Sequence, residues 1–372
     1  MSKIKLSLCL LLIDALVFSS YSHADLRDSV TRMMKSCELK DSNACYGLGE
    51  MYKLGYQVVK DFDKSLNFYL KACDLNMGLA CSKAGTIKLG IFGENEDAIK
   101  LYLKGCELKD GSSCTDYGAL FEQGEIVDLD YNKALEYYNL ACELNDGDGC
   151  NNVATIYDNA LCSPQDINNA LYFYDKACSL NSGIGCSNLG YIYLNSEKKD
   201  IKKAISFFEK ACELDEGLGC ANLGILYSDG KQVQKDLKRS FGYYDESCKL
   251  KNGLGCNNLA FYYKNGIETN KSLEMASHLY YKACFYGYGR ACTNLAKMIE
   301  LGPMDYKSAI ELYSMACNLD DPEGCLGFAK LYETTSLDLE QDEIKVQELF
   351  KKACNTGYEK ACVNIQAQDK SK

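Results

Sequence analysis

Ten pairs of cysteines, each with the spacing C-x7-C, recur every 33 to 37 residues along this 372-residue chain. The pairs are Cys37/Cys45, Cys73/Cys81, Cys106/Cys114, Cys142/Cys150, Cys178/Cys186, Cys212/Cys220, Cys248/Cys256, Cys284/Cys292, Cys317/Cys325 and Cys354/Cys362. Thiols at a regular spacing support two chemistries, disulfide formation and the binding of a soft metal ion. A metal site needs further ligands, yet after residue 24 the chain has a single histidine, His278, and no C-x-x-C. The cysteines therefore favour disulfides and predict no metal site.

The first residues predict that the chain is exported. Lys3 and Lys5 precede an apolar run at 6–18, and Ser22-His23-Ala24 is typical of a signal-peptide cleavage site. We therefore expect a signal peptide at 1–24 and a mature chain at 25–372 that is secreted or periplasmic. No later stretch is apolar over the length that spans a bilayer, so we expect no membrane anchor in the mature form. An oxidising compartment agrees with ten disulfides.

Two cysteines fall outside the ten pairs. Cys9 lies in the predicted signal peptide, so Cys162 is the cysteine left over in the mature chain. Cys162 precedes Ser163-Pro164 in a predicted loop, where it could form an intermolecular disulfide or remain a buried free thiol. Both alternatives stay open at this point.

A period of this length is typical of an array in which one supersecondary unit stacks on copies of itself. In the unit at 128–160, Asp130 is a helix-capping residue, and a helix over 131–144 ends just after the first cysteine of its pair. Small and aromatic residues such as Ala134, Tyr138 and Ala141 fall on one face of that helix. A turn then leads to a second helix, which starts at Cys150.

Glycines recur five residues after the first cysteine of a pair, and we expect them to supply the left-handed residue that ends each first helix. They are Gly78, Gly111, Gly147, Gly183, Gly217 and Gly253. In the second helices a glycine or alanine recurs four residues after the second cysteine. This small residue predicts a close contact between helices, in which rings of Tyr and Phe pack against it.

The second helices resemble the Sel1-like repeat, a relative of the tetratricopeptide repeat, and the signature is clearest at 223–230, Leu-Gly-Ile-Leu-Tyr-Ser-Asp-Gly. With its cysteines, the chain is similar to the secreted Helicobacter cysteine-rich proteins. The resemblance implies an all-α fold, a right-handed α/α solenoid (superhelix) of about nine to ten disulfide-linked helical hairpins. We expect one solenoid over 25–372, with end caps at about 26–36 and 363–372.

The charge of the chain restricts its partners. With 41 Lys and Arg against 52 Asp and Glu, the net charge is −11. An acidic surface without a dense basic cluster predicts that the protein binds neither nucleic acid nor anionic lipid. No sequence motif indicates a cofactor.

The residues two positions after the second cysteine are the best candidates for function, because five consecutive units have Asn there. They are Asn152, Asn188, Asn222, Asn258 and Asn294, which we call the asparagine row. At position +6 stand Ile156, Ile192, Leu226, Tyr262 and Met298, which we expect to face solvent beside these amides. Such a surface suits an extended peptide or protein ligand, since Asn both donates to and accepts from a peptide unit. A purely structural role, in which each Asn fixes the packing of neighbouring repeats, is equally compatible with the sequence.

The resemblance also implies an alternative function, because members of the Helicobacter family are described as binding or weakly hydrolysing β-lactams. A serine β-lactamase needs S-x-x-K together with K-T-G. The motif S-x-x-K occurs at Ser196/Lys199 and at Ser228/Lys231, whereas K-T-G is absent from the chain. The residues therefore favour a non-enzymatic binding scaffold and leave β-lactam activity as the alternative, with no catalytic residue assigned.

Overall fold

The computed structural model describes residues 29–162, 164–196, 199–300, 306–334, 343–355 and 361–362. The predicted signal peptide at 1–24 and the predicted end cap at 363–372 lie outside these residues. The chain divides between Leu180 and Asn181 into two compact units, here called unit 1 and unit 2. The prediction of one solenoid domain over 25–372 stays a prediction.

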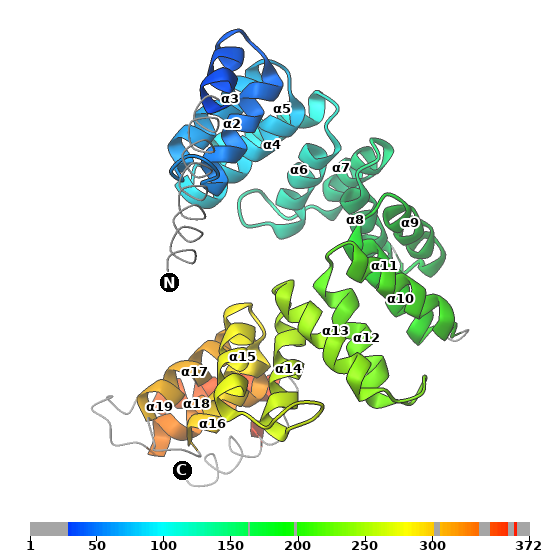
Figure 1. Ribbon diagram of the computed structural model, residues 1–372, viewed down its shortest axis with the longest axis vertical. Helices are drawn as coiled ribbons and strands as arrows, with labels where there is room; N and C mark the ends of the chain where they lie inside the picture. The colour runs from blue at the N-terminus through cyan, green and yellow to red at the C-terminus, as the bar shows by residue number, and fades with distance from the viewer. Residues whose placement is uncertain are drawn as a thin grey trace, which may run out of the picture. The chain divides into compact units, whose positions relative to one another are not determined.

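Every regular element in the described residues is helical (Figure 1). Unit 1 contains a helix at 29–38, then α2 (Ser42–Leu54), α3 (Phe62–Asp74), α4 (Gly78–Ile87), a short π-helix η1 (Lys88–Phe92), α5 (Asn95–Glu107), α6 (Gly111–Gln123), α7 (Tyr131–Glu143), α8 (Gly147–Asp158) and α9 (Ile167–Ser179). Unit 2 contains α10 (Gly183–Asn195), α11 (Ile201–Glu213), α12 (Gly217–Asp229), α13 (Leu237–Lys249), α14 (Gly253–Asn265), α15 (Leu273–Phe285), α16 (Gly289–Glu300), α17 (Tyr306–Asn318), α18 (Pro322–Thr334) and α19 (Glu343–Asn355).

Helices of two kinds alternate along the chain. The odd-numbered helices from α3 onward end one residue after the first cysteine of a pair, and the even-numbered helices contain the second cysteine near their start. Within each unit, consecutive helices lie side by side, and each even-numbered helix from α2 to α16 packs most extensively on the odd-numbered helix that follows it. The prediction of an all-α solenoid of disulfide-linked helical hairpins is therefore confirmed.

The predicted capping residues begin most of the odd-numbered helices. The Asp61 side chain accepts from the Lys64 amide at 3.0 Å, and Asp236 does the same for the Arg239 amide at 3.0 Å. These bonds satisfy amide groups that lack a partner in the first turn of a helix. Glu94, which occupies the same position before α5, makes no such side-chain bond.

In α2, α4, α6, α10 and α12 the predicted small residue is a glycine, and the ring of a Tyr or Phe packs against it. A Cβ atom on Gly49 would lie 2.6 Å from the Tyr69 ring, and one on Gly224 would lie 2.5 Å from the Tyr244 ring. Real Cβ atoms do not come so close to other atoms, so only glycine lets the ring lie against the helix backbone. Ala134, Tyr138 and Ala141 are fully buried, as their pattern predicts.

Within each unit, disulfides join consecutive helices across a short turn. Nine of the predicted pairs are bonded with Cα atoms 4.4 to 4.9 Å apart: Cys37–Cys45, Cys73–Cys81, Cys106–Cys114, Cys142–Cys150, Cys212–Cys220, Cys248–Cys256, Cys284–Cys292, Cys317–Cys325 and Cys354–Cys362. Both cysteines of the tenth predicted pair, Cys178 and Cys186, are also disulfide-bonded. Up to α16, the bonds within each unit lie where the packing between consecutive helices is less extensive.

The expected role of the glycines five residues after the first cysteine is wrong. Gly78 and Gly217 begin α4 and α12, and the left-handed residues of those turns are Asn76 and Asp215, with φ of 63° and 60°. A Cβ on Gly217 would lie 2.6 Å from the Asn252 Cβ. These glycines are therefore needed where the start of one even-numbered helix meets the start of the next.

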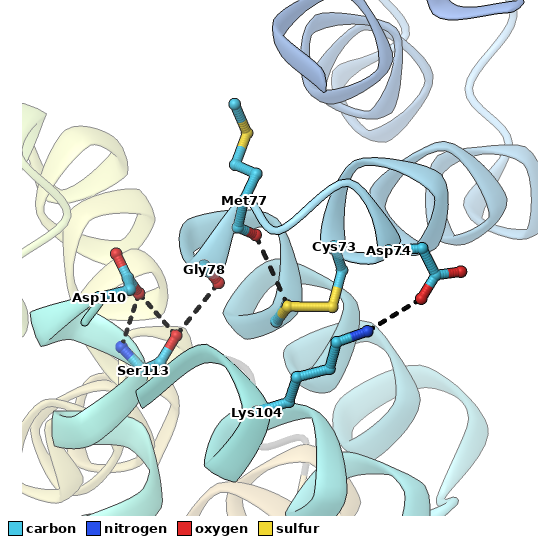
Figure 2. Close-up of a disulfide and its surroundings, with 8 residues drawn as sticks. Cys73, Asp74, Met77, Gly78, Lys104, Asp110 and Ser113 are labelled. Atoms are coloured by element: carbon cyan, nitrogen blue, oxygen red, sulfur yellow. Dashed lines mark hydrogen bonds and ion pairs between the residues drawn. A yellow bond between two sulfur atoms is a disulfide. The ribbon is translucent and has the colours of Figure 1, made fainter. Parts of the chain in front are cut away.

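Polar contacts add to this packing around the disulfides. In Figure 2 the hydroxyl of Ser113 in α6 lies 3.2 Å from the Gly78 carbonyl oxygen at the start of α4. Lys104 in α5 forms an ion pair with Asp74 at the end of α3, with 2.9 Å between Nζ and Oδ1. Neighbouring repeats are thus joined by packing, by a covalent bond and by side-chain contacts.

Candidate functional site

The asparagine row lies on successive even-numbered helices, with Asn152 on α8 of unit 1 and the other four on α10, α12, α14 and α16 of unit 2. All five side chains are half-buried. In unit 2 the even-numbered helices also contact one another directly, so their exposed sides form a continuous surface. The structure therefore brings Asn188, Asn222, Asn258 and Asn294 together in one row.

The expectation that the apolar residues at position +6 face solvent is wrong. Ile156, Leu226 and Tyr262 are 0%, 6% and 3% exposed, and Ile192 and Met298 are half-buried. An even-numbered helix packs against its own partner helix and also against the even-numbered helices on either side. Position +6 lies about 240° around the helix from the cysteine, on a side covered by these neighbours.

Position +5, about 140° around the helix, is open instead. In unit 2 this position is Lys297 in α16 and Lys330 in α18. In α10, α12 and α14 it is occupied by Tyr191, Ile225 and Phe261, whose exposed fractions are 59%, 38% and 51%. We call these three residues the exposed apolar row. Each stands three residues after an Asn of the asparagine row, so amides and apolar side chains lie next to each other on the same surface.

The three helices that carry the exposed apolar row contain almost no charge, although a quarter of the whole chain is Asp, Glu, Lys or Arg. There is none in α10, and α12 has only Asp229, its last residue. In α14 the one charged residue is Lys264, next to the end of the helix. We call the joint surface of α10, α12 and α14 the neutral face.

A hollow of about 360 Å³ opens on the neutral face between α12 and α14. Asn258, Phe261 and Tyr262 line it from α14, together with Tyr244 and Ser228. Lys235 is the charged residue in its lining. A second hollow, of about 520 Å³, lies over the odd-numbered helices α11 and α13 with Glu209, Arg239 and Glu246 in its wall, and it is more open to solvent.

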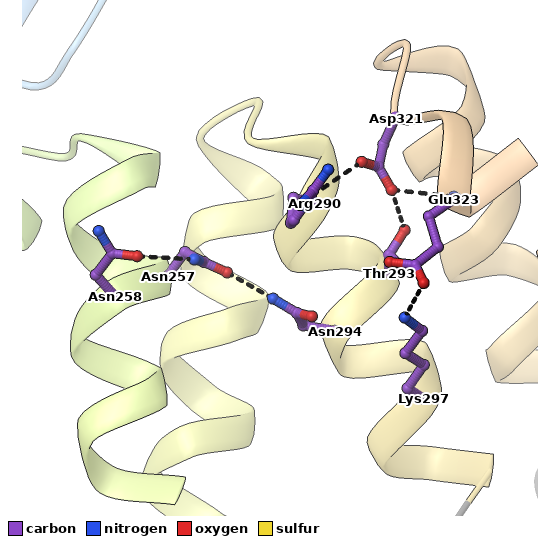
Figure 3. A network of polar contacts seen from close by, with 9 residues as sticks. Asn257, Asn258, Arg290, Thr293, Asn294, Lys297, Asp321 and Glu323 are labelled. Carbon is purple, nitrogen blue, oxygen red and sulfur yellow. Dashed lines mark hydrogen bonds and ion pairs between the residues drawn. The ribbon is translucent and has the colours of Figure 1, made fainter. Parts of the chain in front are cut away.

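A chain of amide hydrogen bonds leads to the first hollow (Figure 3). Asn294 Nδ2 donates to Asn257 Oδ1 at 2.8 Å, and Asn257 Nδ2 donates to Asn258 Oδ1 at 3.1 Å. The Asn258 NH₂ group in turn faces the Tyr244 hydroxyl, and this hydrogen bond opposes the effect of burial on the pKa of that tyrosine. The asparagine row thus has a structural role in joining α14 to α16, and Asn258 also lines the hollow.

The residue one position after the second cysteine, position +1, makes contacts that were not predicted from the sequence. Ser82 donates to Asp116 at 2.6 Å from α4 to α6, and Thr293 donates to Asp321, which caps α18, at 2.6 Å. Asp321 also lies 3.4 Å from Arg290 Nε. Short polar residues recur at this position in α4, α6, α8, α10, α14 and α16, and this recurrence is the signal that could have revealed them.

Buried tyrosines bond to the preceding even-numbered helix. Tyr69 donates to Glu50 at 2.6 Å, and Tyr313 donates to Glu300 at 3.0 Å. Burial, and then the neighbouring carboxylate, raises the pKa of Tyr69 well above its usual range. Burial also raises the pKa of Tyr244, at the hollow. These hydroxyls therefore stay protonated and act as hydrogen-bond donors at neutral pH.

The residues of the alternative function are not assembled into a catalytic pair. Ser228 donates to the Ile225 carbonyl at 2.9 Å and lies 3.3 Å from the Tyr244 hydroxyl, whereas Lys231 forms an ion pair with Asp229 at 3.1 Å. Ser196 and Lys199 flank residues 197 and 198, which lie outside the described residues. β-Lactam binding stays a prediction that no contact supports.

Three further findings concern the described part of the chain. Cys162 is a free cysteine there, half-buried beside the cluster that contains Tyr138 and Ile156. No group of three or more His, Cys, Asp or Glu side chains among these residues is arranged to hold a metal ion. None of their helices combines the length and the apolar character needed to cross a membrane.

The fold and the neutral face define a class of protein, the all-α repeat scaffold. The family model of the Sel1 repeat matches eight segments, at residues 42–77, 78–110, 111–146, 147–182, 183–216, 217–252, 253–284 and 289–321. The chain therefore belongs to the Sel1 repeat family. Each matched segment begins with an even-numbered helix, so the predicted disulfide-closed hairpins are out of phase with the Sel1 repeats. Within each unit, disulfides such as Cys73–Cys81 and Cys248–Cys256 therefore link one matched repeat to the next.

The chain is similar to several solved structures, and two of them, with TM-scores of 0.50 and 0.55, show the same fold. The protein c5321, a protective antigen present in uropathogenic Escherichia coli strains, is 21% identical, with 91% of this chain and 74% of that chain covered and a TM-score of 0.50. A Sel1 repeat protein from Oxalobacter formigenes is 23% identical, with 65% and 99% covered and a TM-score of 0.55. Helicobacter pylori cysteine rich protein B is 35% identical over 34% of this chain and 93% of its own, with a TM-score of 0.30. No curated protein matches the chain.

Proposed function

We propose that this protein is a non-catalytic binding scaffold whose neutral face holds an extended peptide segment of a protein partner. Sel1 repeat proteins typically mediate protein–protein interactions. The observation that carries the proposal is the exposed apolar row, which stands beside the asparagine row on three helices of an acidic chain whose two charged residues lie at or next to a helix end. Exposed apolar groups with polar groups beside them are typical of interaction sites.

The two rows have complementary roles in this proposal. Apolar side chains of the peptide pack on Tyr191, Ile225 and Phe261. These three residues then lose their remaining contact with water. The amides of the asparagine row bond to the peptide backbone, which presents both a donor and an acceptor at each unit. The chain from Asn294 to Asn258 orients one of these amides in advance, so that less side-chain entropy is lost on binding.

We also propose that the scaffold works outside the reducing cytoplasm, secreted or periplasmic. The disulfides support this proposal, because such bonds persist in oxidising compartments. The predicted signal peptide at 1–24 points in the same direction.

Selection of random twelve-residue peptides on the oxidised full chain tests the binding proposal. Selected peptides should lose at least about 30-fold in affinity for a Tyr191→Lys/Ile225→Lys/Phe261→Lys variant, because burying apolar groups against three unpaired cations is unfavourable. Binding is measured by isothermal titration calorimetry, and circular dichroism checks that the variant is folded.

The matched control adds three lysines to the odd-numbered helices of the same unit, as Ser206→Lys/Gly242→Lys/Tyr281→Lys. All three residues are exposed, and a Cβ on Gly242 meets no atom within 4 Å. This control should bind the selected peptides as the unchanged protein does. Equal losses in both variants, or none in the first, contradict the placement of the site on the neutral face.

A further inference from the structure

The spacing of the exposed apolar row limits the conformation that a bound peptide can have. The row places one apolar side chain on each of α10, α12 and α14, which contact their neighbours directly. Helices in contact have axes about 8 to 10 Å apart. A peptide that crosses them must therefore present an apolar group about every 8 to 10 Å on one side.

A polyproline II helix meets this requirement. It has three residues per turn and rises about 3.1 Å per residue, so every third side chain lies on the same side at intervals of about 9.3 Å. In a β-strand, side chains on one side repeat every second residue, at intervals of about 6.8 Å. This interval is shorter than the spacing of the helices, so the side chains no longer coincide with the row beyond the first helix.

The chemistry of the neutral face suits the same ligand. Tyr191 and Phe261 expose more than half of their surface, and exposed aromatic rings are what proline-rich segments dock against. A polyproline II backbone has no internal hydrogen bonds, so its carbonyl groups are free to accept. Asn258, at the end of the amide chain, lines the hollow beside Phe261, and its NH₂ group has a second N–H besides the one that faces Tyr244.

The small number of charged residues on the neutral face further restricts which peptides it can bind. α10 has no charged residue, and the charges of α12 and α14 lie at their C-terminal ends. A charged peptide side chain would lose water over the central turns without gaining a partner, which is unfavourable. An uncharged segment avoids this loss.

We infer that the neutral face binds an uncharged, proline-rich segment in the polyproline II conformation, with an apolar side chain at every third residue. This inference rests on the proposed function and specifies its ligand. The distance from α10 to α14, about 16 to 20 Å, corresponds to a contact of about six or seven residues. A twelve-residue peptide is long enough to cover it.

Three capped, uncharged twelve-residue peptides test the inference by calorimetry on the oxidised full chain. The first has four repeats of Pro-Pro-Leu. The second has the same composition with its leucines moved so that they no longer share one side. The third has no proline and alternates Thr and Val. We expect the first to bind at least about ten-fold more tightly than the others, and to lose at least about 30-fold on Tyr191→Lys/Ile225→Lys/Phe261→Lys.

The other outcomes separate the two proposals. Equal binding of the first and second peptides overturns the argument from spacing. If the third peptide binds in a lysine-sensitive manner and the first does not, the polyproline conformation is wrong and the proposed function stands. If none binds, and random selection also yields no peptide that is sensitive to the three lysines, the proposed function fails and this inference fails with it.

Discussion

The two units of the chain have the same scaffold and different surfaces. Both pack a ring on a glycine, as in Gly49 with Tyr69 and Gly224 with Tyr244. At the exposed position of the even-numbered helices, however, unit 1 has Glu50, Thr86, Ala119 and Thr155, whereas α10, α12 and α14 of unit 2 have Tyr191, Ile225 and Phe261, and α16 and α18 have Lys297 and Lys330. The repeat therefore determines which residues occupy the buried positions, while the exposed side of each even-numbered helix varies with function.

The polar contacts differ in the same way. In unit 1 charged residues lie within the even-numbered helices, and two of them, Glu50 and Asp116, accept bonds from Tyr69 and Ser82. In unit 2 the contact from Asn294 to Asn257 is between uncharged amides, whereas Thr293 donates to Asp321 and Lys297 forms an ion pair with Glu323. These charged contacts of unit 2 lie at α16 and α18, outside the neutral face.

The largest expected effect is the loss of the disulfides, which both units share. Closing so small a ring stabilises a protein by about 2 to 3 kcal/mol. Cys73→Ser/Cys81→Ser in unit 1 and Cys248→Ser/Cys256→Ser in unit 2 should each lower the free energy of unfolding by about this amount, and full reduction should lower it far more. Urea unfolding with and without reductant measures both. A melt that reductant leaves unchanged would contradict the shared scaffold.

Filling the glycine contacts should destabilise both units by a similar amount. Gly49→Val and Gly224→Val place a side chain where Tyr69 and Tyr244 lie, and overpacking of this kind costs about 1 to 3 kcal/mol. Gly242→Ala on α13 is the control, because its Cβ meets open space and alanine favours a helix. Thermal unfolding should show a loss for the first two variants and none for the third. A loss in only one unit would mean that the scaffolds are not equivalent.

Removing one contact between neighbouring even-numbered helices should cost about 1 kcal/mol in either unit. Asn257→Ala removes the partner of Asn294 in unit 2, and Ser82→Ala removes the donor to Asp116 in unit 1. Asn257→Ala should also weaken peptide binding, because Asn258 loses the bond that orients it, whereas Ser82→Ala should not. Chemical unfolding and calorimetry, performed on both variants, distinguish the structural role from the binding role.

The smallest effect concerns Asp116, which occupies in unit 1 the position of the asparagine row. Burial raises the pKa of Asp116, with Asp146 and Asp110 adding to the rise and Ser82 and Lys83 opposing it. A raised carboxyl pKa favours the folded state at low pH, and this contribution is lost as the pH rises through the folded-state pKa. Asp116→Asn should therefore raise the free energy of unfolding at pH 7 and leave it unchanged at pH 3, as measured by urea unfolding at the two pH values. An increase in the free energy of unfolding that does not depend on pH would contradict the assignment of the effect to the ionisation of Asp116.

The sequence predicted the parts of the fold that depend on the helix itself. The capping role of Asp236 and the burial of Ala134, Tyr138 and Ala141 follow from helix geometry and are confirmed. The roles of Gly217 and Leu226 were wrong for a common reason. Both residues meet a neighbouring repeat, and the pattern of a single hairpin does not show which of its sides a second hairpin covers.

The same reason limited the prediction of the site. The asparagine row was found because one residue type recurs at one position. The exposed apolar row was missed because a tyrosine, an isoleucine and a phenylalanine share no identity, only exposure. The absence of charge from α10 and from most of α12 and α14 was visible in the sequence and would have indicated the same surface.

Hydrogen–deuterium exchange on the oxidised full chain, with and without a saturating selected peptide, tests the central claim most directly. We expect the protection on binding to be concentrated at 183–195, 217–229 and 253–265, the three helices of the neutral face. The corresponding helices of unit 1, at 42–54, 78–87 and 111–123, should exchange as before. Protection confined to unit 1, or to α11 and α13, would contradict the placement of the binding site on the neutral face.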